Sequence, residues 1–184
     1  AWTHCLREDA RLVPRGATLR AMLVQLGSND EDLDVSCLTT QRFQSDYYGL
    51  QLREEPHKRL SEPFDVFGFD FGRTAALGAT YLEGAWRGDV TVVAGGRLNC
   101  VVFWHALDLG EATLATGPDE AETCWLQACQ PLEEIWVEAG TPVPLKASHQ
   151  GSRCTFSVER SEDYADRRTA TDLYDPRALA LHNE

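Results

Sequence analysis

Residues 100–132, CVVFWHALDLGEATLATGPDEAETCWLQACQPL, hold the densest group of side chains in this chain that could do chemistry. His105 and Cys124 are the ingredients of a nucleophilic pair, and an acidic cluster at 119–122 leads into Cys124. A thiol needs a nearby base or cation to become a nucleophile, yet this spacing fits no known catalytic pattern, and a buried cysteine is the commoner case. The stretch is therefore half of an active site, a docking surface, or two strands and a loop.

Charge is distributed unevenly along the chain. No Lys or Arg lies between Arg97 and Lys146, and the formal net charge of the chain is -12. Such a surface attracts cationic peptides and repels phosphates, so we predict a basic partner, or solubility alone, and no nucleic acid. Trp104 and Trp125 add aromatic faces that either hold a guanidinium by cation–π contact or pack in the core. The carboxylates between Arg97 and Lys146 are Asp108, Glu111, Asp119, Glu120, Glu122, Glu133, Glu134 and Glu138.

Motifs of self-contained enzymes are absent from the sequence. It has no glycine-rich dinucleotide loop after a strand, no phosphate-binding loop, no nucleophile elbow and no HExxH zinc motif. The six cysteines form no CxxC pair, so we expect no metal and reduced thiols, as in a cytoplasmic and/or nuclear protein. No signal peptide opens the chain, and no apolar run approaches the ~20 residues that cross a bilayer, so no membrane partner is predicted.

The length predicts one domain. A chain of 184 residues with 43% hydrophobic residues can close a single core, and we predict a single β-barrel domain over residues 1–184. Within it, residues 1–10 are interpreted as the end of a helix from a preceding domain. Residues 37–60 are interpreted as a short, partly helical, arm-like insertion, and residues 161–184 as a surface tail.

Short strands at close intervals, without long helical patterns, predict a mainly β, antiparallel barrel or sandwich. From Ala17 the apolar residues alternate up to Leu23 and lead into a fuller apolar run, as in a strand that becomes buried on both faces. Gly95-Gly96 lies between two strand patterns and predicts a hairpin turn. In FDVFGFDF, alternation predicts two faces. One face carries Phe64, Val66 and Gly68, and the other carries Asp65, Phe67 and Phe69.

The order of these segments resembles the C-terminal β-barrel and dimerisation arm of protein arginine N-methyltransferases. The segments that carry the resemblance are RLVPRGATLRAMLVQL, LSEPFDVFGFDFGR, GRLNCVVFWHALDL and LATGPDEAETCWLQACQPL, in that order. They present a strand, an L-S-E-P-F sequence before an F-D-F strand, and a Gly-Pro loop that leads into Thr-x-Trp. The resemblance covers residues 10–160, and the short arm is most similar to that of the tandem-repeat members of the family.

The resemblance implies a role for the Thr-x-Trp loop, which matches a Thr-His-Trp loop that borders the substrate arginine. Glu122, Thr123, Cys124 and Trp125 are therefore predicted to bind substrate. Cys124 replaces the central histidine, a change that fits a degenerate copy.

The resemblance places S-adenosylmethionine and the paired glutamates that grip the guanidinium in the N-terminal half, so no catalytic, cofactor-binding or metal-binding residue is assigned here. The pairs Glu54-Glu55 and Glu133-Glu134 are not that motif, because neighbours on a strand point to opposite faces.

Three functions follow as hypotheses. The first is the substrate side of an S-adenosylmethionine-dependent arginine methyltransferase, with three partners: the N-terminal cofactor domain, an arginine-containing basic protein or peptide, and a second copy in a homodimer or an intrachain pseudo-dimer. The second is a degenerate, non-catalytic scaffold or interaction module. The third is a stand-alone acidic sandwich that binds small ligands. In the first, the arm residues that would cover a neighbouring cofactor domain are Phe43, Tyr47, Tyr48 and Leu50.

Overall fold

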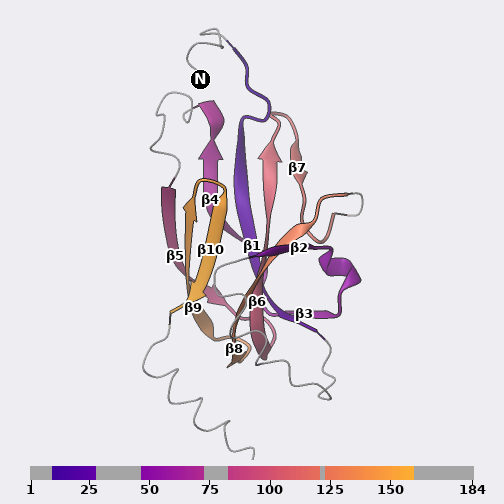
Figure 1. Cartoon of the computed structure of the whole chain (residues 1–184), viewed down its shortest axis with the longest axis vertical. Coiled ribbons are helices and arrows are strands. Elements are labelled where there is room, and N and C mark those ends of the chain that lie inside the picture. Colours follow the sequence, from indigo (N-terminus) through magenta and orange to yellow (C-terminus); the bar gives the residue numbers. More distant parts are fainter. Residues whose placement is uncertain (1–9, 28–46, 73–82, 121–122, 160–184) are drawn as a thin grey trace, which may run out of the picture.

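The computed structural model describes residues 10–27, 47–72, 83–120 and 123–159. These residues form ten strands and a short 3₁₀ turn, Leu52–Glu54. The predicted mainly β, antiparallel fold is confirmed. The strands are β1 (Gly16–Leu26), β2 (Tyr48–Leu50), β3 (His57–Arg59), β4 (Phe64–Asp70), β5 (Glu83–Thr91), β6 (Gly96–Asp108), β7 (Thr113–Ala115), β8 (Gln127–Val137), β9 (Pro142–Gln150) and β10 (Arg153–Val158). Figure 1 shows β1, β4, β5 and β6 running lengthwise and the short strands β2 and β3 lying across them.

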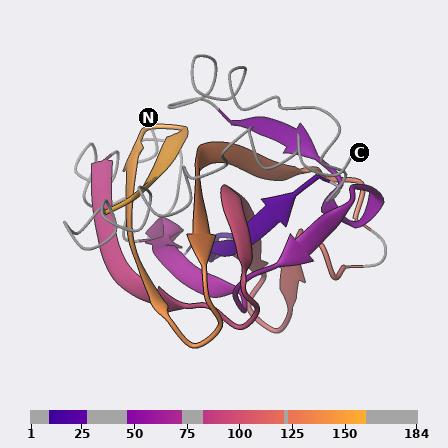
Figure 2. The same ribbon diagram turned by 90° about the horizontal axis from the view of Figure 1, so that it is seen from below.

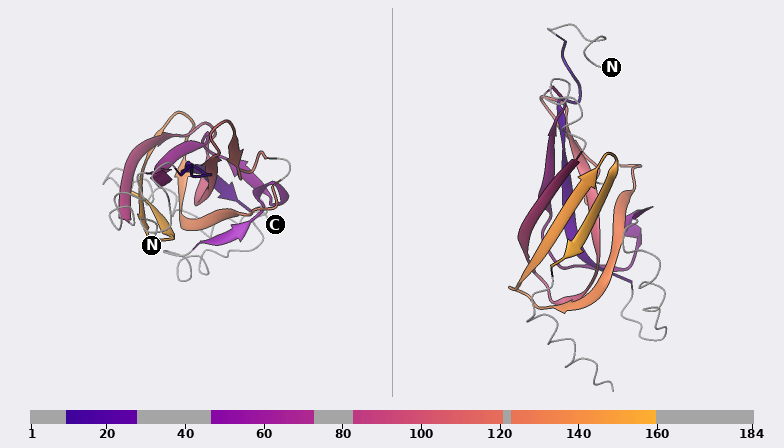
Figure 3. Two further views of the ribbon diagram at one scale, coloured as in Figure 1. Left: turned by 90° about the horizontal axis from the view of Figure 1, so that it is seen from above. Right: turned by 60° about the vertical axis from the view of Figure 1, so that its left-hand side comes forward.

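Two antiparallel sheets make up the fold. The larger sheet has the order β2-β8-β6-β1-β3, with β4 also pairing with β1 and β7 with β6, and the smaller has the order β10-β9-β5. The long pair β1 and β6 forms the centre of the larger sheet, in register from Gly16 opposite Asp108 to Val24 opposite Cys100. The right-hand view of Figure 3 shows the hairpin β9–β10 lying over the larger sheet.

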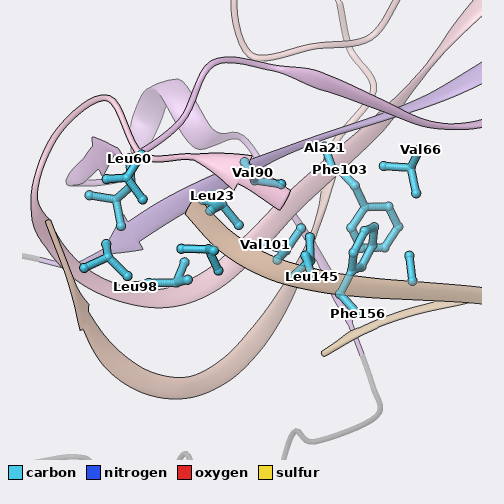
Figure 4. Packing of buried hydrophobic residues seen from close by; sticks show 14 of the residues in the cluster. Ala21, Leu23, Leu60, Val66, Val90, Leu98, Val101, Phe103, Leu145 and Phe156 are labelled. Carbon is cyan, nitrogen blue, oxygen red and sulfur yellow. The ribbon is translucent and has the colours of Figure 1, made fainter. Parts of the chain in front are cut away.

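The main hydrophobic core lies between the two sheets. Leu23 and Val101 from the larger sheet meet Leu145 and Phe156 from the smaller one, and all four are buried (Figure 4). Leu60 closes the core near the end of β1. Burial of each such side chain contributes roughly 1.5 to 3 kcal/mol relative to exposure, so this layer fixes how the sheets face each other.

The sheets meet along their borders without joining into a closed barrel, and the arrangement is a sandwich (Figure 2). On one border Phe64 of β4 stacks on Trp86 of β5, with ring centroids 5.7 Å apart. On the other, the Gln130 side chain of β8 donates to the Phe156 carbonyl at 2.7 Å and accepts from the Phe156 N–H at 2.8 Å. A side-chain amide thus takes the place of a neighbouring strand's peptide group.

A second, smaller core covers the opposite face of the larger sheet. Its buried side chains from β1 and β6 include Met22, Val102 and Trp104, and residues Leu50 and Leu52 cover them. The middle of β1, residues 21–25, is therefore buried on both faces, which confirms the prediction made from its apolar run.

Two local predictions were wrong. Gly95-Gly96 is not a hairpin turn, because β5 pairs with β9 whereas β6 pairs with β1 and β8, so the chain crosses between the sheets here. Strict alternation also fails in β4, where a register shift opposite Leu19 and Arg20 places both Val66 and Phe67 in the main core.

The arm-like insertion is described from residue 47 onward, as β2, the 3₁₀ turn and β3. Leu50 packs into the second core of its own sandwich, so it does not cover a neighbouring domain. Tyr47 sets its ring edge-on to Phe103 with centroids 5.2 Å apart, and its hydroxyl donates to the Ser152 carbonyl at 3.2 Å. The predicted helix end at 1–10, except Ala10, the surface tail and Phe43 lie outside the described residues.

Candidate functional site: the loop before β8

The predicted substrate-facing residues lie in the connection between β7 and β8, at the right of Figure 1. The side chains of Trp125 and Leu126 are 44% and 56% exposed, Cys124 is exposed, and Thr123 is half-buried. The Thr123 hydroxyl accepts from the Trp125 N–H at 3.1 Å, a local turn that orders the backbone around Cys124. A large aromatic ring is thus presented to solvent on an ordered support, while Glu122 lies outside the described residues.

The ring of His105 packs against the ring of Trp125. The two ring centroids lie 4.9 Å apart and are tilted by 48°, and His105 is half-buried on β6. Burial lowers the pKa of His105 from its usual 6.5, so the imidazole is neutral at pH 7. The sequence allowed a Cys124–His105 pair, but the structure places the imidazole against the indole of Trp125.

Trp104 has a different environment from Trp125. It is 5% exposed and belongs to the second core. A Cβ placed on Gly117 would lie 2.7 Å from Trp104 Nε1, so the loop backbone lies directly on the indole and any larger residue at 117 would collide. Of the two proposed aromatic faces, Trp125 is open to a cation and Trp104 packs in the core.

Polar contacts fasten the loop to the segment that contains β2 and β3. Arg59 on β3 donates to both carboxylate oxygens of Asp119, one bond measuring 3.0 Å. Gln51 Nε2 donates to the Thr123 carbonyl at 3.3 Å. Gln127, which is 1% exposed, accepts from the Leu52 N–H at 3.0 Å and donates to the Thr116 carbonyl at 2.9 Å. Sequence reasoning missed these contacts, since nothing in the spacing of Gln51, Arg59 and Gln127 marks them.

The acidic stretch is partly neutralised. Arg59 lowers the pKa of Asp119 from its usual 3.8 through the hydrogen-bonded ion pair, and Arg97 lies 3.9 Å from a carboxylate oxygen of Glu134. Near the loop, Glu111 and Glu120 are exposed. These two carboxylates of the acidic stretch are therefore open to solvent, whereas Asp119 is paired with Arg59.

A second feature that the sequence did not predict is a groove of about 900 Å³ where β1 begins and β4 and β6 end. Its lining has mixed charge, with Arg11 and Arg15 facing a surface that also includes Asp70, Asp108 and Glu111. Arg15 lies against Gly110, where a Cβ would come within 2.8 Å of its guanidinium. Such a mixture selects no single class of ligand.

Within the described ranges, no cluster of three His, Cys, Asp or Glu side chains is arranged to hold a metal ion. No helix in those ranges has the length and apolarity needed to cross a membrane. The described cysteines, Cys100, Cys124, Cys129 and Cys154, are free thiols, and only Cys124 among these four is exposed.

Comparison with known proteins gives a consistent set of relatives, although no protein-family model matches the chain. An arginine N(omega)-methyltransferase of Streptomyces achromogenes is 31% identical over 157 residues, which cover 78% of this chain and 39% of the relative. Protein arginine N-methyltransferase 9 of Xenopus laevis is 39% identical over 80 residues, and that of Homo sapiens is 30% identical over 95. These matches cover 43% and 50% of this chain but 10% and 11% of the relatives. The chain thus spans well under half of the proteins it matches.

Proposed function

We propose, from the premise that this chain is homologous to arginine N-methyltransferases over most of its length, that it forms the substrate-facing β-domain of such an enzyme. Its loop before β8 would form one wall of the groove that receives an arginine-containing, basic peptide. The observation that carries this proposal is Trp125, which is 44% exposed although a ring contact and a local turn hold it in place. An exposed, ordered indole is suited to stacking on a guanidinium.

The charge of the chain supports a basic substrate. The net charge is -12, and of two exposed carboxylates Glu111 precedes the loop and Glu120 lies within it. These groups would raise the local concentration of a cationic peptide and orient it, an effect that weakens as salt is added. In this arrangement the domain supplies positioning, which lowers the barrier by bringing the reacting groups together.

S-adenosylmethionine would be held by a different domain of the whole protein and would supply the methyl group. The family resemblance places the cofactor in the N-terminal half of such enzymes. We therefore assign to this chain's residues the binding of the peptide, and no step of methyl transfer. A homodimer or an intrachain pseudo-dimer, with the segment 37–60 as its arm, remains part of the same proposal.

The decisive experiment joins this chain to the portion of the Streptomyces enzyme that it does not match and measures methylation of an Arg-Gly-rich peptide. Trp125→Ala should raise KM by about three- to thirtyfold, the range of a lost cation–π contact, and leave kcat nearly unchanged. Trp136→Ala is the matched control, because Trp136 is 62% exposed at the opposite end of β8. Equal KM values for wild type and Trp125→Ala would remove Trp125 from the peptide groove.

The second candidate function is a non-catalytic interaction module in the cytoplasm and/or nucleus. The observation that favours it is Cys124, which stands where the family resemblance implies a histidine and is exposed. In that case the chain alone should bind basic peptides in preference to acidic ones, with affinity that falls as salt rises, while the joined protein shows no turnover. Equal binding of an Arg-Gly-rich and a Glu-Gly-rich peptide would contradict both functions.

A further inference from the structure

The loop from Thr116 to Leu126 has a fixed base and an exposed tip. Thr116, Gly117 and Pro118 are buried, and the backbone at Gly117 lies on the Trp104 indole. From residue 119 onward the described side chains are exposed, apart from the half-buried Thr123. The tip carries Trp125, which also contacts the His105 ring, so the contacts that hold the loop bear on where the Trp125 ring is presented.

Arg59 binds the loop at Asp119, where the exposed part of the loop begins. The guanidinium donates through Nη1 to Asp119 Oδ2 at 3.0 Å and through Nη2 to Oδ1. Two parallel bonds between a planar guanidinium and a carboxylate fix orientation as well as distance. Arg59 and Asp119 lie 60 residues apart in sequence and belong to β3 and the loop respectively, so the pair joins two segments that share no strand ladder.

The ion pair is too exposed to hold the fold together. The side chain of Arg59 is 40% exposed and that of Asp119 is 63% exposed, and exposed pairs contribute little to global stability. A small contribution is nevertheless enough to shift the equilibrium between two positions of an exposed loop tip. Glu62 and His57 are the other titratable groups that act on the pair, and neither replaces the two-point contact.

Further hydrogen bonds link the loop to the segment 50–59, which contains Arg59. Gln51, next to β2, donates to the Thr123 carbonyl, and Gln127 joins the Leu52 N–H to the Thr116 carbonyl. The segment 50–59 therefore contacts the loop at its base, at Asp119 and at Thr123. A shift of this segment would carry the loop tip with it.

We propose that Arg59 is a positioning residue that acts through Asp119 to set the place of the Thr123–Trp125 tip, and so couples the segment 50–59 to the substrate-facing loop. The effect on peptide binding rests on the function proposed above. The effect on the loop itself does not, since it concerns contacts within this chain.

The test uses the 184-residue chain and compares two ion pairs of similar exposure. Arg59→Met and Asp119→Asn each remove the loop pair. Arg20→Met removes the control pair, in which Arg20 Nε lies 3.0 Å from Asp65 Oδ1 with side-chain exposures of 38% and 70%. The control pair joins β1 to β4 and includes no residue of the loop. A charge swap, Arg59→Glu with Asp119→Arg, tests rescue of the pairing.

The first readout is hydrogen exchange of the backbone amides at residues 119, 120 and 123–126. Arg59→Met and Asp119→Asn should each speed exchange about two- to fivefold, the factor expected from an exposed ion pair, with the midpoint of global unfolding nearly unchanged. Arg20→Met should leave loop exchange as in wild type, and the charge swap should recover at least half of the change. Unchanged exchange in both Arg59→Met and Asp119→Asn, or an equal increase in Arg20→Met, would overturn the proposal.

The second readout is the dissociation constant of an Arg-Gly-rich peptide, which should rise about two- to fivefold in Arg59→Met and return toward wild type in the charge swap. Faster loop exchange with unchanged peptide affinity would leave Arg59 as a positioning residue and would remove the loop from the peptide site. Failure of the wild-type chain to prefer this peptide over a Glu-Gly-rich one would contradict the proposed function, while the exchange data would still decide the role of Arg59.

Discussion

The two faces of the larger sheet are covered in different ways. On one face, a continuous core forms with the smaller sheet and includes sixteen of the described residues, among them Leu23, Val101 and Leu145. On the other face, the described part of the chain contributes eight buried residues to a core that Leu50 and Leu52 cover. The first face is therefore fixed by apolar area, whereas the second depends on polar contacts that hold its cover in place.

Side-chain amides form polar contacts with the backbone at several places in the larger sheet. Gln127 bonds the Leu52 N–H on one side and the Thr116 carbonyl on the other, and Asn99 forms two bonds with the backbone of Leu26, at 2.8 and 2.9 Å. A carboxamide presents a donor and an acceptor with the spacing of a peptide group, so it can satisfy backbone groups that no neighbouring strand reaches. The comparison predicts that the loss of apolar volume lowers the free energy of unfolding more in the main core than in the second core.

The largest effect should come from Leu145→Ala in the main core. Leu145 is fully buried between the sheets, so the change should lower the free energy of unfolding by roughly 2 to 5 kcal/mol. Leu52→Ala, equally buried in the second core, should fall at the low end of this range because its short cover segment can collapse into the cavity. Chemical denaturation measures both, and a larger loss in Leu52→Ala would reverse the comparison.

A smaller effect is expected for Gln130→Leu, which tests a polar contact within the main core. The substitution leaves the N–H and carbonyl of Phe156 without the Gln130 amide, and buried unsatisfied groups cost about 1 to 3 kcal/mol each, partly offset here by the added apolar side chain. We expect a net loss of about 2 kcal/mol. Gln150→Leu, which removes an exposed bond to Glu83, is the control and should change stability little. Equal losses in the free energy of unfolding would show that the buried Gln130 contact contributes no more than an exposed hydrogen bond.

The smallest effect should be the contribution of His105 to the pH dependence of the free energy of unfolding. Its pKa in the folded chain lies below the usual 6.5 because of burial, so the unfolded chain takes up the proton first. The free energy of unfolding should therefore fall as the pH drops from above 6.5 through the folded-state pKa, by less than about 1 kcal/mol for a half-exposed ring. His105→Phe keeps the ring against Trp125 and should remove this part of the slope in pH-dependent thermal unfolding. An unchanged slope would exclude His105 as its source.

Sequence patterns predicted the fold class. The alternation and apolar run within 17–26 predicted β1 with burial on both faces, whereas the substrate-binding role of residues 122–125 came from the family resemblance and stays a prediction. The hairpin at Gly95-Gly96 and the two-faced strand at 64–71 were wrong. In both cases the outcome depended on pairing with distant strands, which brought β5 to β9 and introduced a bulge in β4. Local propensity contains no information on such partners.

By itself, the sequence determined that this chain buries short antiparallel strands, carries a strongly acidic surface, and presents a Thr-Cys-Trp tripeptide after a Gly-Pro bend. These properties follow from residue types at neighbouring positions, where periodicity and turn chemistry act directly. Only the tertiary structure decided that Trp125 is exposed while Trp104 is buried, and that Asp119 is paired with Arg59. It also decided that the side-chain amides of Gln127 and Gln130 bond to backbone groups in place of a neighbouring strand. Each of these depends on contacts between residues far apart in the chain, and such contacts form only when the two sheets and the covering segment have packed together.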